Sequence, residues 1–386
     1  MNWDRLEKEC DSLNMKGNIL TQGESVIKTL KNEINYAFEA SELISKCERV
    51  LLAGAGDKYL IPMISEYLWQ YFTHKPIRVI HSRVLADYGI KRGKGTCVIF
   101  ISQSGRTGDT LDAVEKVVPE GIKAIGVTNL KEKSSDTLYQ IEDHGGVVLK
   151  THTILYPEEP TPSTATFHST LVLLNVLLLY ALHREGKGVE ELIEKQTREV
   201  PELIDELSRS KDVIRWGIEK ATDFLEFSGS SFYVVGDGPR YPIARKQALI
   251  MLMEACKQDA CPIEAEEFSH SLIETLEPEN RNKKPLILLK PKEDFVSKSL
   301  SNHLEFIERI WKKYGGENRF LDVDPFDFTD YEISNYAGNL LTPPLYMIPL
   351  EWFTYYYAIA QKIDPGKTKL VDKIRSGGQR EIKQKI

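Results

Sequence analysis

The strongest constraint on the fold is a repeated alternation of short apolar runs with amphipathic segments. In the first half of the chain, apolar runs occur at residues 50–53, 77–80, 96–101, 124–128 and 146–149. Helical patterns lie between them, and a long apolar helix is predicted at 166–183. Strands that are buried on both faces of a parallel sheet have continuous apolar sequences and need helical crossovers. The alternation therefore predicts a parallel sheet with right-handed crossovers.

The same order of elements returns in the second half. Strands are predicted at 231–235 and 285–289, and helices at 243–253, 304–314 and 345–361. Both halves open with an apolar run that enters a Gly-x-Gly turn, Gly54-Ala55-Gly56 and Gly236-Asp237-Gly238. The period of roughly 180 residues is too long for a solenoid repeat. We expect two α/β domains, each a flavodoxin-like three-layer unit with a parallel sheet flanked by helices.

The pattern divides the 386 residues into five segments. We expect an N-terminal helical segment at 1–46, a first domain at 47–190, a helical connector at 191–226, a second domain at 227–361 and a C-terminal tail at 362–386.

Composition excludes several classes of protein. Fifty Lys and Arg against 57 Asp and Glu give a net charge of −7, so the chain lacks the basic surface expected for nucleic acid or an anionic membrane. The five cysteines are scattered and form no CxxC metal pair. The charged N-terminus has no apolar signal core, and the apolar run at 171–182 is too short for the ~20 residues that span a bilayer. We expect a cytoplasmic protein without a bound metal.

The segment 102–107, SQSGRT, has the composition of an anion-binding loop. It follows a buried strand and precedes a helix, and ligands of doubly wound sheets bind beyond the carboxyl ends of the strands. Three hydroxyls, a glycine and the N-terminus of a helix favour a phosphate group. The alternative is a polar turn with a helix cap, since Ser and Thr also cap helices.

This loop lies in a stretch, ISQSGRTGDTLDAV, that resembles the SQSGET phosphate loop of sugar isomerase (SIS) domains. The resemblance covers most of residues 45–375. Over this range the chain is similar to the isomerase half of glutamine–fructose-6-phosphate amidotransferase. LLAGAGDKYL, TPSTATF and GDGPRYPIA resemble other segments of that family. The resemblance implies that the sugar phosphate is bound by Ser102, Gln103, Ser104 and Thr107. It also implies that Gly56 and Ser163 contact the substrate; the alternative for Ser163 is a helix cap.

The second half contains the residues that the resemblance assigns to catalysis, within EACKQDACPIEAEEFSH. Glu254 would move the proton between C1 and C2 of the sugar, and His270, sixteen residues later, would open the ring. Glu267 would orient His270, because a carboxylate can fix an imidazole tautomer. In the family this histidine reaches the site of a neighbouring subunit, so a homodimer or larger assembly is implied. The alternative for all three is a solvated surface position.

In the tail, the resemblance places Lys373 where the amidotransferase has its Schiff-base lysine. The Pro-Arg-Asn core of the family's segment is absent here, and the alternative is a solvated tail lysine.

Three further features depart from the family. Asp57-Lys58 replaces the Thr-Ser that often follows the first strand. Ile250 and Met251 replace a polar turn, and alignment of Glu254 requires one extra residue in its helix. We expect no glutaminase domain before the first unit, and therefore no amidotransfer.

These features predict a cofactor-independent enzyme that acts on a hexose 6-phosphate or amino-hexose 6-phosphate. It would be an aldose–ketose isomerase or an amine-releasing deaminase or deglycase. One alternative is a phosphosugar-binding regulatory protein without catalysis. Another is a nucleotide-binding domain, but the GAG and GDG turns lack a full GxGxxG.

Overall fold

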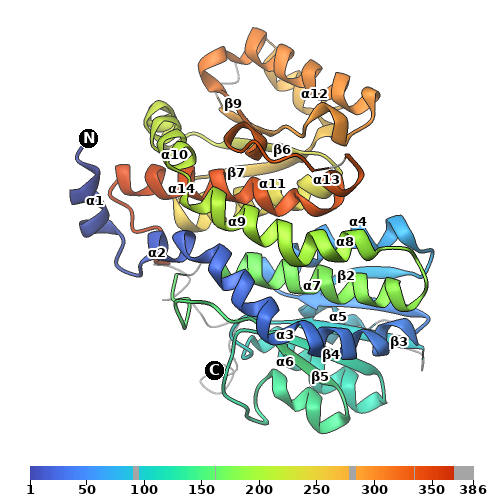
Figure 1. Cartoon of the computed structure of the whole chain (residues 1–386). Coiled ribbons are helices and arrows are strands. Elements are labelled where there is room, and N and C mark those ends of the chain that lie inside the picture. The colour runs from blue at the N-terminus through green and yellow to red at the C-terminus, as the bar shows by residue number, and fades with distance from the viewer. Residues whose placement is uncertain (90–94, 161, 278–283, 334, 369–386) are drawn as a thin grey trace. The chain divides into compact units, whose positions relative to one another are not determined.

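The computed structural model describes residues 1–89, 95–160, 162–277, 284–333 and 335–368. They form two compact units (Figure 1). The β1–β5 unit is formed mainly by Thr21–Glu158 and Ser163–Glu202. The β6–β9 unit comprises Met1–Leu20, Glu159–Pro162 and Leu203–Lys367.

The β1–β5 unit is built on a five-stranded parallel sheet in the order β2-β1-β3-β4-β5. Its strands are β1 Arg49–Gly54, β2 Ile77–His81, β3 Thr96–Ile101, β4 Lys123–Thr128 and β5 Val147–Lys150. The chain leaves β1 outward to β2 and leaves β3 outward to β4, so the strand order reverses between β1 and β3. Ligands of such sheets bind at this reversal, beyond the carboxyl ends of the strands.

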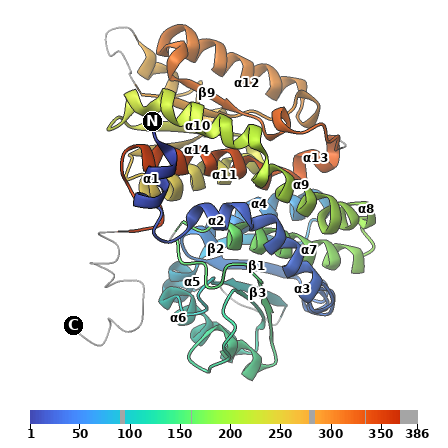
Figure 2. The same cartoon turned by 60° about the vertical axis from the view of Figure 1, so that its left-hand side comes forward.

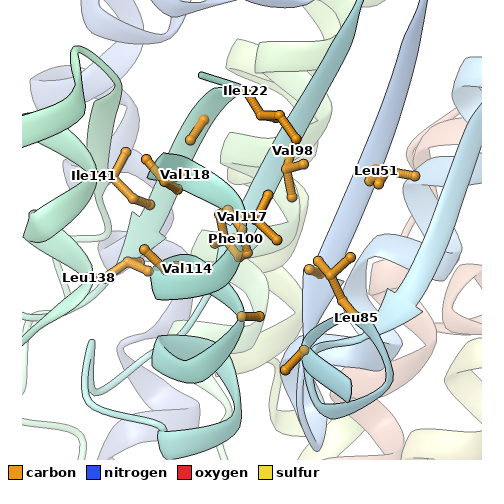
Figure 3. Packing of buried hydrophobic residues seen from close by; sticks show 14 of the residues in the cluster. Leu51, Leu85, Val98, Phe100, Val114, Val117, Val118, Ile122, Leu138 and Ile141 are labelled. Carbon is orange, nitrogen blue, oxygen red and sulfur yellow. The ribbon is translucent and has the colours of Figure 1, made fainter. Parts of the chain in front are cut away.

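Helices cover both faces of this sheet (Figure 2). One face carries α3 Gln22–Ser45, α4 Asp57–Phe72 and α7 Ala165–Arg184, and α7 packs against both of the others. The other carries α5 Ser82–Tyr88, α6 Gly108–Val117 and the 3-10 segment Leu138–His144, whose apolar side chains meet Val98 and Phe100 of β3 (Figure 3). By length and composition α7 could cross a membrane, but 94% of its apolar window is buried within the protein. It is the central core helix of this unit.

The β6–β9 unit has a four-stranded parallel sheet in the order β7-β6-β8-β9. The strands are β6 Phe232–Gly236, β7 Ala260–Glu264, β8 Leu286–Leu289 and β9 Phe320–Val323. α12 Lys298–Ile310 covers one face, and α10 Lys211–Asp223 and α14 Met347–Ala360 pack together in the same unit. The remaining α-helices are α1 Trp3–Cys10, α2 Met15–Leu20, α8 Glu190–Glu194, α9 Val200–Arg209, α11 Tyr241–Lys246 and α13 Asn335–Leu341.

The boundaries of the compact units differ from those of the predicted segments. The predicted N-terminal segment 1–46 is divided, because α1 contacts the aromatic helix α14 whereas α3 packs on α7. Trp3 and Glu7 of α1 both contact Tyr356. The predicted connector 191–226 is likewise divided between Glu202 and Leu203.

A glycine ends the first strand of each unit for the same steric reason. A Cβ at Gly54 would lie 2.0 Å from the Lys58 carbonyl oxygen, and one at Gly236 would lie 2.6 Å from the Arg240 carbonyl oxygen. In both units the first turn of the following helix therefore packs directly on the strand.

We expect Gly54→Ala and Gly236→Ala each to lower the free energy of unfolding by about 2 kcal/mol or more, because backbone rather than side chain must move. Urea unfolding measures this loss. Gly95→Ala is the matched control, since the three atoms nearest to its Cβ all belong to the flexible Glu48 side chain. An unfolding midpoint unchanged in both strand variants would contradict the packing described here.

Candidate active site

The loop 102–107 connects β3 to α6 at the carboxyl edge of the first sheet. The Ser102 and Thr107 hydroxyl oxygens are 2.9 Å apart and hydrogen-bonded. The Arg106 backbone N–H donates to Ser104 Oγ at 3.2 Å. Thr107 is the N-cap of α6, and its side chain makes no capping hydrogen bond. The cap in the alternative interpretation is therefore not seen at Thr107, whereas the bonds within the loop are those of a polar turn.

Residues at the end of β4 and in the segment that follows it fix the backbone of the loop. The Gln103 carbonyl accepts from Asn129 N at 3.0 Å and Thr128 Oγ1 at 3.2 Å, and the Gly105 carbonyl accepts from Leu138 N at 2.8 Å. Gly105 has φ +63°, and a Cβ there would lie 2.9 Å from the Leu130 side chain. The loop is thus held in a conformation that glycine permits, with Ser104 exposed.

The N-terminus of α7, by contrast, is filled by a carboxylate from the chain itself. Glu158 is 7% exposed and accepts from the backbone N–H groups of Thr164, Ala165 and Thr166 at 2.7, 3.0 and 2.8 Å. The hydroxyls of Thr164 and Thr166 also donate to it. The N-terminus of a helix stabilises a carboxylate, because its N–H groups lack partners within the helix and the positive end of the helix dipole lies there.

Ser163 immediately precedes this capped helix and is almost fully buried. Its hydroxyl donates to Asp57 Oδ2 at 2.6 Å and accepts from Lys58 Nζ at 3.1 Å. The alternative in which Ser163 caps α7 is wrong, because Thr164 is the N-cap and Glu158 supplies the hydrogen bonds. Gly56, in the turn before Asp57, is exposed, with φ +57°.

Glu254 lies near the end of a π-helical segment, Gln247–Ala255, that continues α11. The Cys256 N–H donates to the Met251 carbonyl at 3.2 Å, five residues back. A π turn holds more residues than an α turn, so this segment absorbs one extra residue without displacing the strand β7 that comes after it. The predicted departure at Ile250 and Met251 falls inside it. The Glu254 side chain is half-buried.

His270 and Glu267 follow β7, and both side chains are exposed. The His270 N–H donates to the Glu267 carbonyl at 3.2 Å, and within the described residues their side chains share no hydrogen bond. Glu254 precedes β7 and His270 follows it, so the two residues lie near opposite ends of this five-residue strand. The strand is roughly 16 Å long at 3.3 Å per residue. The structure does not bring this pair together within the unit.

Lys373 lies outside the described residues. The tail is described as far as Thr368, and Lys257 Nζ donates to the carbonyl oxygens of Lys367 and Glu254. The start of the tail therefore lies beside the end of the helix that carries Glu254. Within the described residues, no group of three or more His, Cys, Asp and Glu side chains converges as metal ligands do.

The corresponding edge of the second sheet is filled by an ion pair. Arg240, fully buried, binds Asp237 through Nε at 2.7 Å and Nη2 at 2.5 Å, and Nη1 donates to Asn339 at 3.1 Å. Asp324 follows β9 and accepts from the Phe326 N–H at 3.0 Å. Burial raises the pKa of Asp324 to about 6, against the opposing effect of this hydrogen bond. The described part of this edge has no counterpart of the hydroxyl-rich loop.

Sequence reasoning missed Glu158 as a functional candidate. It precedes the helix by seven residues, outside the spacing of a capping box, and only the fold of segment 158–164 brings it to the N–H groups.

Comparison with known proteins shows which proteins this chain is similar to. The family model of the SIS domain matches residues 43–180, which contain the five strands and the loop 102–107. Residues 43–180 therefore resemble a SIS domain. Over 363 residues the chain is 26% identical to the glutamine–fructose-6-phosphate aminotransferase [isomerizing] of Pyrococcus horikoshii, a match that covers 91% of this chain and 55% of that protein. The chain thus spans about half the length of the curated relatives it matches.

Solved structures extend the similarity of fold beyond the SIS match. The C-terminal domain of glucosamine-fructose-6-phosphate aminotransferase from Francisella tularensis aligns with a TM-score of 0.72 at 19% identity, covering 91% of this chain and 96% of that one. Glucosamine-6-phosphate deaminase from Thermotoga maritima aligns with a TM-score of 0.61 at 16% identity, covering 90% and 97%. The expected fold, two α/β units each with a parallel sheet flanked by helices, is confirmed.

The raised pKa of Asp324 gives a pH-dependent prediction. Its folded-state pKa of about 6 exceeds the ordinary value of 3.8, so the folded protein binds this proton more tightly and loses stability as pH rises from about 4 to 6. Asparagine can keep the bond to Phe326 without a charge. We expect Asp324→Asn to raise the free energy of unfolding at pH 7.5 by up to about 3 kcal/mol, and by less at pH 5. Urea unfolding at both pH values measures this, and an equal effect at the two would contradict burial as the cause.

Proposed function

We propose that the chain is a phosphosugar enzyme, an aldose–ketose isomerase or an amine-releasing deaminase or deglycase, that acts on a hexose 6-phosphate or amino-hexose 6-phosphate. The observation that carries the proposal is the contrast between two helix N-termini of the β1–β5 unit. Glu158 occupies that of α7. At α6 the N-cap residue Thr107 makes no side-chain capping bond, and among the described residues no carboxylate takes the place that Glu158 takes at α7; a hydroxyl-rich loop precedes this helix. A dianionic phosphate suits the second site, because it accepts hydrogen bonds from N–H groups and hydroxyls together.

Local charge supports this placement of the phosphate. Asp109 lies in the first turn of α6, but its carboxylate pairs with Arg83 Nη1 at 3.5 Å. Arg106, within the loop, is exposed and its ion pair with Glu132 is 3.4 Å long. The loop thus carries a cation, and the Asp109 carboxylate is compensated by Arg83.

The catalytic roles follow the family. Glu254 acts as the base that carries the proton between C1 and C2, and His270 opens the ring. Both act on adjacent atoms of one sugar, so each must come within about 3 Å of its target. Because β7 separates them in one chain, the proposal includes a homodimer in which His270 serves the site of the other copy. Glu267 and Lys373 remain proposed contributors, to the orientation of His270 and to amine chemistry.

A regulatory phosphosugar-binding protein is the second candidate. The apolar residues Ile250 and Met251 near Glu254 favour it, as does the absence of a hydrogen bond between the described Glu267 and His270 side chains. The two candidates share the phosphate loop and differ only in chemistry at C1 and C2.

The phosphate site is tested by Ser104→Ala. A hydrogen bond to a charged group contributes about 1.5–3 kcal/mol, so we expect the affinity for fructose 6-phosphate and glucosamine 6-phosphate to fall about 10-fold or more, as measured by isothermal titration calorimetry. Because Ser104 is exposed, thermal stability should not change. Ser135→Ala, an exposed serine of the same unit, is the matched control. Unchanged affinity in Ser104→Ala would count against the site.

Catalysis is tested by hydrogen exchange at C1 of fructose 6-phosphate and at C2 of glucosamine 6-phosphate in heavy water, followed by NMR. We expect Glu254→Gln to slow the exchange by about 10²–10⁴-fold, the usual contribution of a general base, while binding persists. Glu266→Gln, at an exposed position, should leave the rate unchanged. A wild-type protein that binds these sugars without exchanging protons would favour the regulatory alternative.

A further inference from the structure

The fold of the β1–β5 unit brings together two cysteines that lie 50 residues apart in the sequence. Cys47 lies in the bend between α3 and β1, and Cys97 is the second residue of β3. The chain before β1 runs beside the start of β3, because the Glu48 N–H donates to the Gly95 carbonyl at 2.7 Å. Both cysteines therefore lie at the amino end of β3, whereas the loop 102–107 follows its carboxyl end.

The two thiols meet on one face of the sheet. Successive side chains of a strand point to opposite faces. Val98 and Phe100 of β3 pack on the face that carries α5 and α6 (Figure 3), so Cys97 points to the face that carries α3. Cys47 follows the end of α3, and its thiol forms a side-chain hydrogen bond with the Cys97 thiol. Cys97 is completely buried, and Cys47 is 6% exposed.

Two lysines place positive charge beside this pair. The Lys75 ammonium donates to the carbonyl oxygen of Ser45, the last residue of α3, at 3.0 Å. Lys123 of β4 is paired in register with Cys97 in the neighbouring strand. Cations near a thiol stabilise its thiolate, which is the form that attacks an oxidant.

The hydrogen bond and the cations act differently on the two thiols. The bond from Cys97, together with the two ammonium groups, lowers the pKa of Cys47 although burial opposes this. The same bond raises the pKa of Cys97, which keeps its proton as the donor. Burial without such partners raises the pKa of a thiol, as it does for Cys256. The pair thus combines a thiol that ionises readily with a protonated neighbour.

We propose that Cys47 and Cys97 are a redox-active pair that a hydroperoxide oxidises to a disulfide, and that this bond makes the stability of the β1–β5 unit depend on its redox state. This inference goes beyond the proposed function and does not depend on it. Neither cysteine has a role in the proposed chemistry on the sugar.

The reaction has two steps. The Cys47 thiolate attacks one oxygen of hydrogen peroxide and becomes a sulfenic acid, while the other oxygen leaves as hydroxide and takes up the proton that the thiol had lost. The Cys97 sulfur then attacks the Cys47 sulfur and forms the S–S bond. The displaced hydroxyl group leaves as water with the Cys97 proton. In sum, two thiols lose two electrons and one hydrogen peroxide is reduced to two molecules of water.

Cys47 lies where this reaction requires movement and access. A disulfide brings two sulfur atoms closer together than a hydrogen bond does. Cys97 is fixed in the middle strand of the sheet, whereas Cys47 lies in a bend outside helix and strand and retains some exposed surface. The new bond closes a loop that contains β1, α4, β2 and α5, and so restricts the unfolded chain.

The test treats the wild-type protein with hydrogen peroxide, blocks the remaining thiols with iodoacetamide and maps disulfides by mass spectrometry. We expect a Cys47–Cys97 disulfide that dithiothreitol reduces again, while Cys256 stays a free thiol. The oxidised protein should unfold at a temperature about 5 °C or more above that of the reduced protein, because the bond closes a long loop.

Variants separate the roles of the two thiols. In Cys97→Ala we expect Cys47 to react with hydrogen peroxide about 10-fold more slowly and to stop at the sulfenic acid, which dimedone traps. Cys47→Ser should give neither the disulfide nor the higher unfolding temperature. Cys261→Ser, which replaces an exposed cysteine of the other unit, is the matched control and should behave as the wild type does. Circular dichroism confirms that each variant is folded.

Two results for the wild type would overturn the inference, whether or not the variants fold. One is that hydrogen peroxide leaves both thiols free, or oxidises Cys47 to a sulfinic acid without an S–S bond to Cys97. The other is an unfolding temperature that stays the same after the disulfide has formed.

Discussion

The account depends on how the positive ends of helices are satisfied at the carboxyl edge of the first sheet. Glu158 supplies a buried carboxylate to α7 and so removes that helix as a place for an external anion. α6 has no such internal partner among the described residues, and its preceding loop carries hydroxyls that bond to each other and to backbone N–H groups. The Ser163 hydroxyl, immediately before this helix, bonds to Asp57 and Lys58. At this edge of the sheet, one helix N-terminus is thus occupied by the chain itself and the other is preceded by a hydroxyl-rich loop.

The second unit has the same architecture, but the carboxyl edge of its sheet is filled differently. After β6, the glycine packing of β1 recurs, but the Asp237–Arg240 ion pair fills the edge of the sheet. A bidentate pair satisfies these charges within the chain. The fold is therefore duplicated, whereas the described phosphate loop belongs to one unit. In this unit the proposed catalytic base, Glu254, lies on the π-helical segment between β6 and β7.

Most of the fold could be predicted from sequence because its strands are central and apolar. β1, β3, β4, β6 and β8 are buried along nearly their whole length, and each was marked by a continuous apolar run. β7 and β9 were not predicted. Both are edge strands; β7 contains Pro262 and partly exposed residues, and β9 has four residues with Asp322 exposed. Edge strands tolerate such residues, so the apolar pattern fails there.

The candidate site could be predicted where its residues are contiguous. Ser102, Gln103, Ser104 and Thr107 lie in one loop, and their order along the chain predicts a phosphate site that stays a prediction. Contacts between distant segments left no such signal: Ser163 lies 106 residues from Asp57, and no spacing rule indicated that Glu158 would cap α7 in its place. The one-residue excess before Glu254 was visible, but its accommodation as a π-helix depends on hydrogen bonds that only the fold shows.

The central claim is that a phosphate group binds at the N-terminus of α6. The most direct measurement is a crystal structure of the protein soaked with fructose 6-phosphate or glucosamine 6-phosphate. The account predicts phosphate oxygens within hydrogen-bonding distance of the Ser102, Ser104 and Thr107 hydroxyls and of the first N–H groups of α6. A phosphate located elsewhere while this loop remains empty would contradict it.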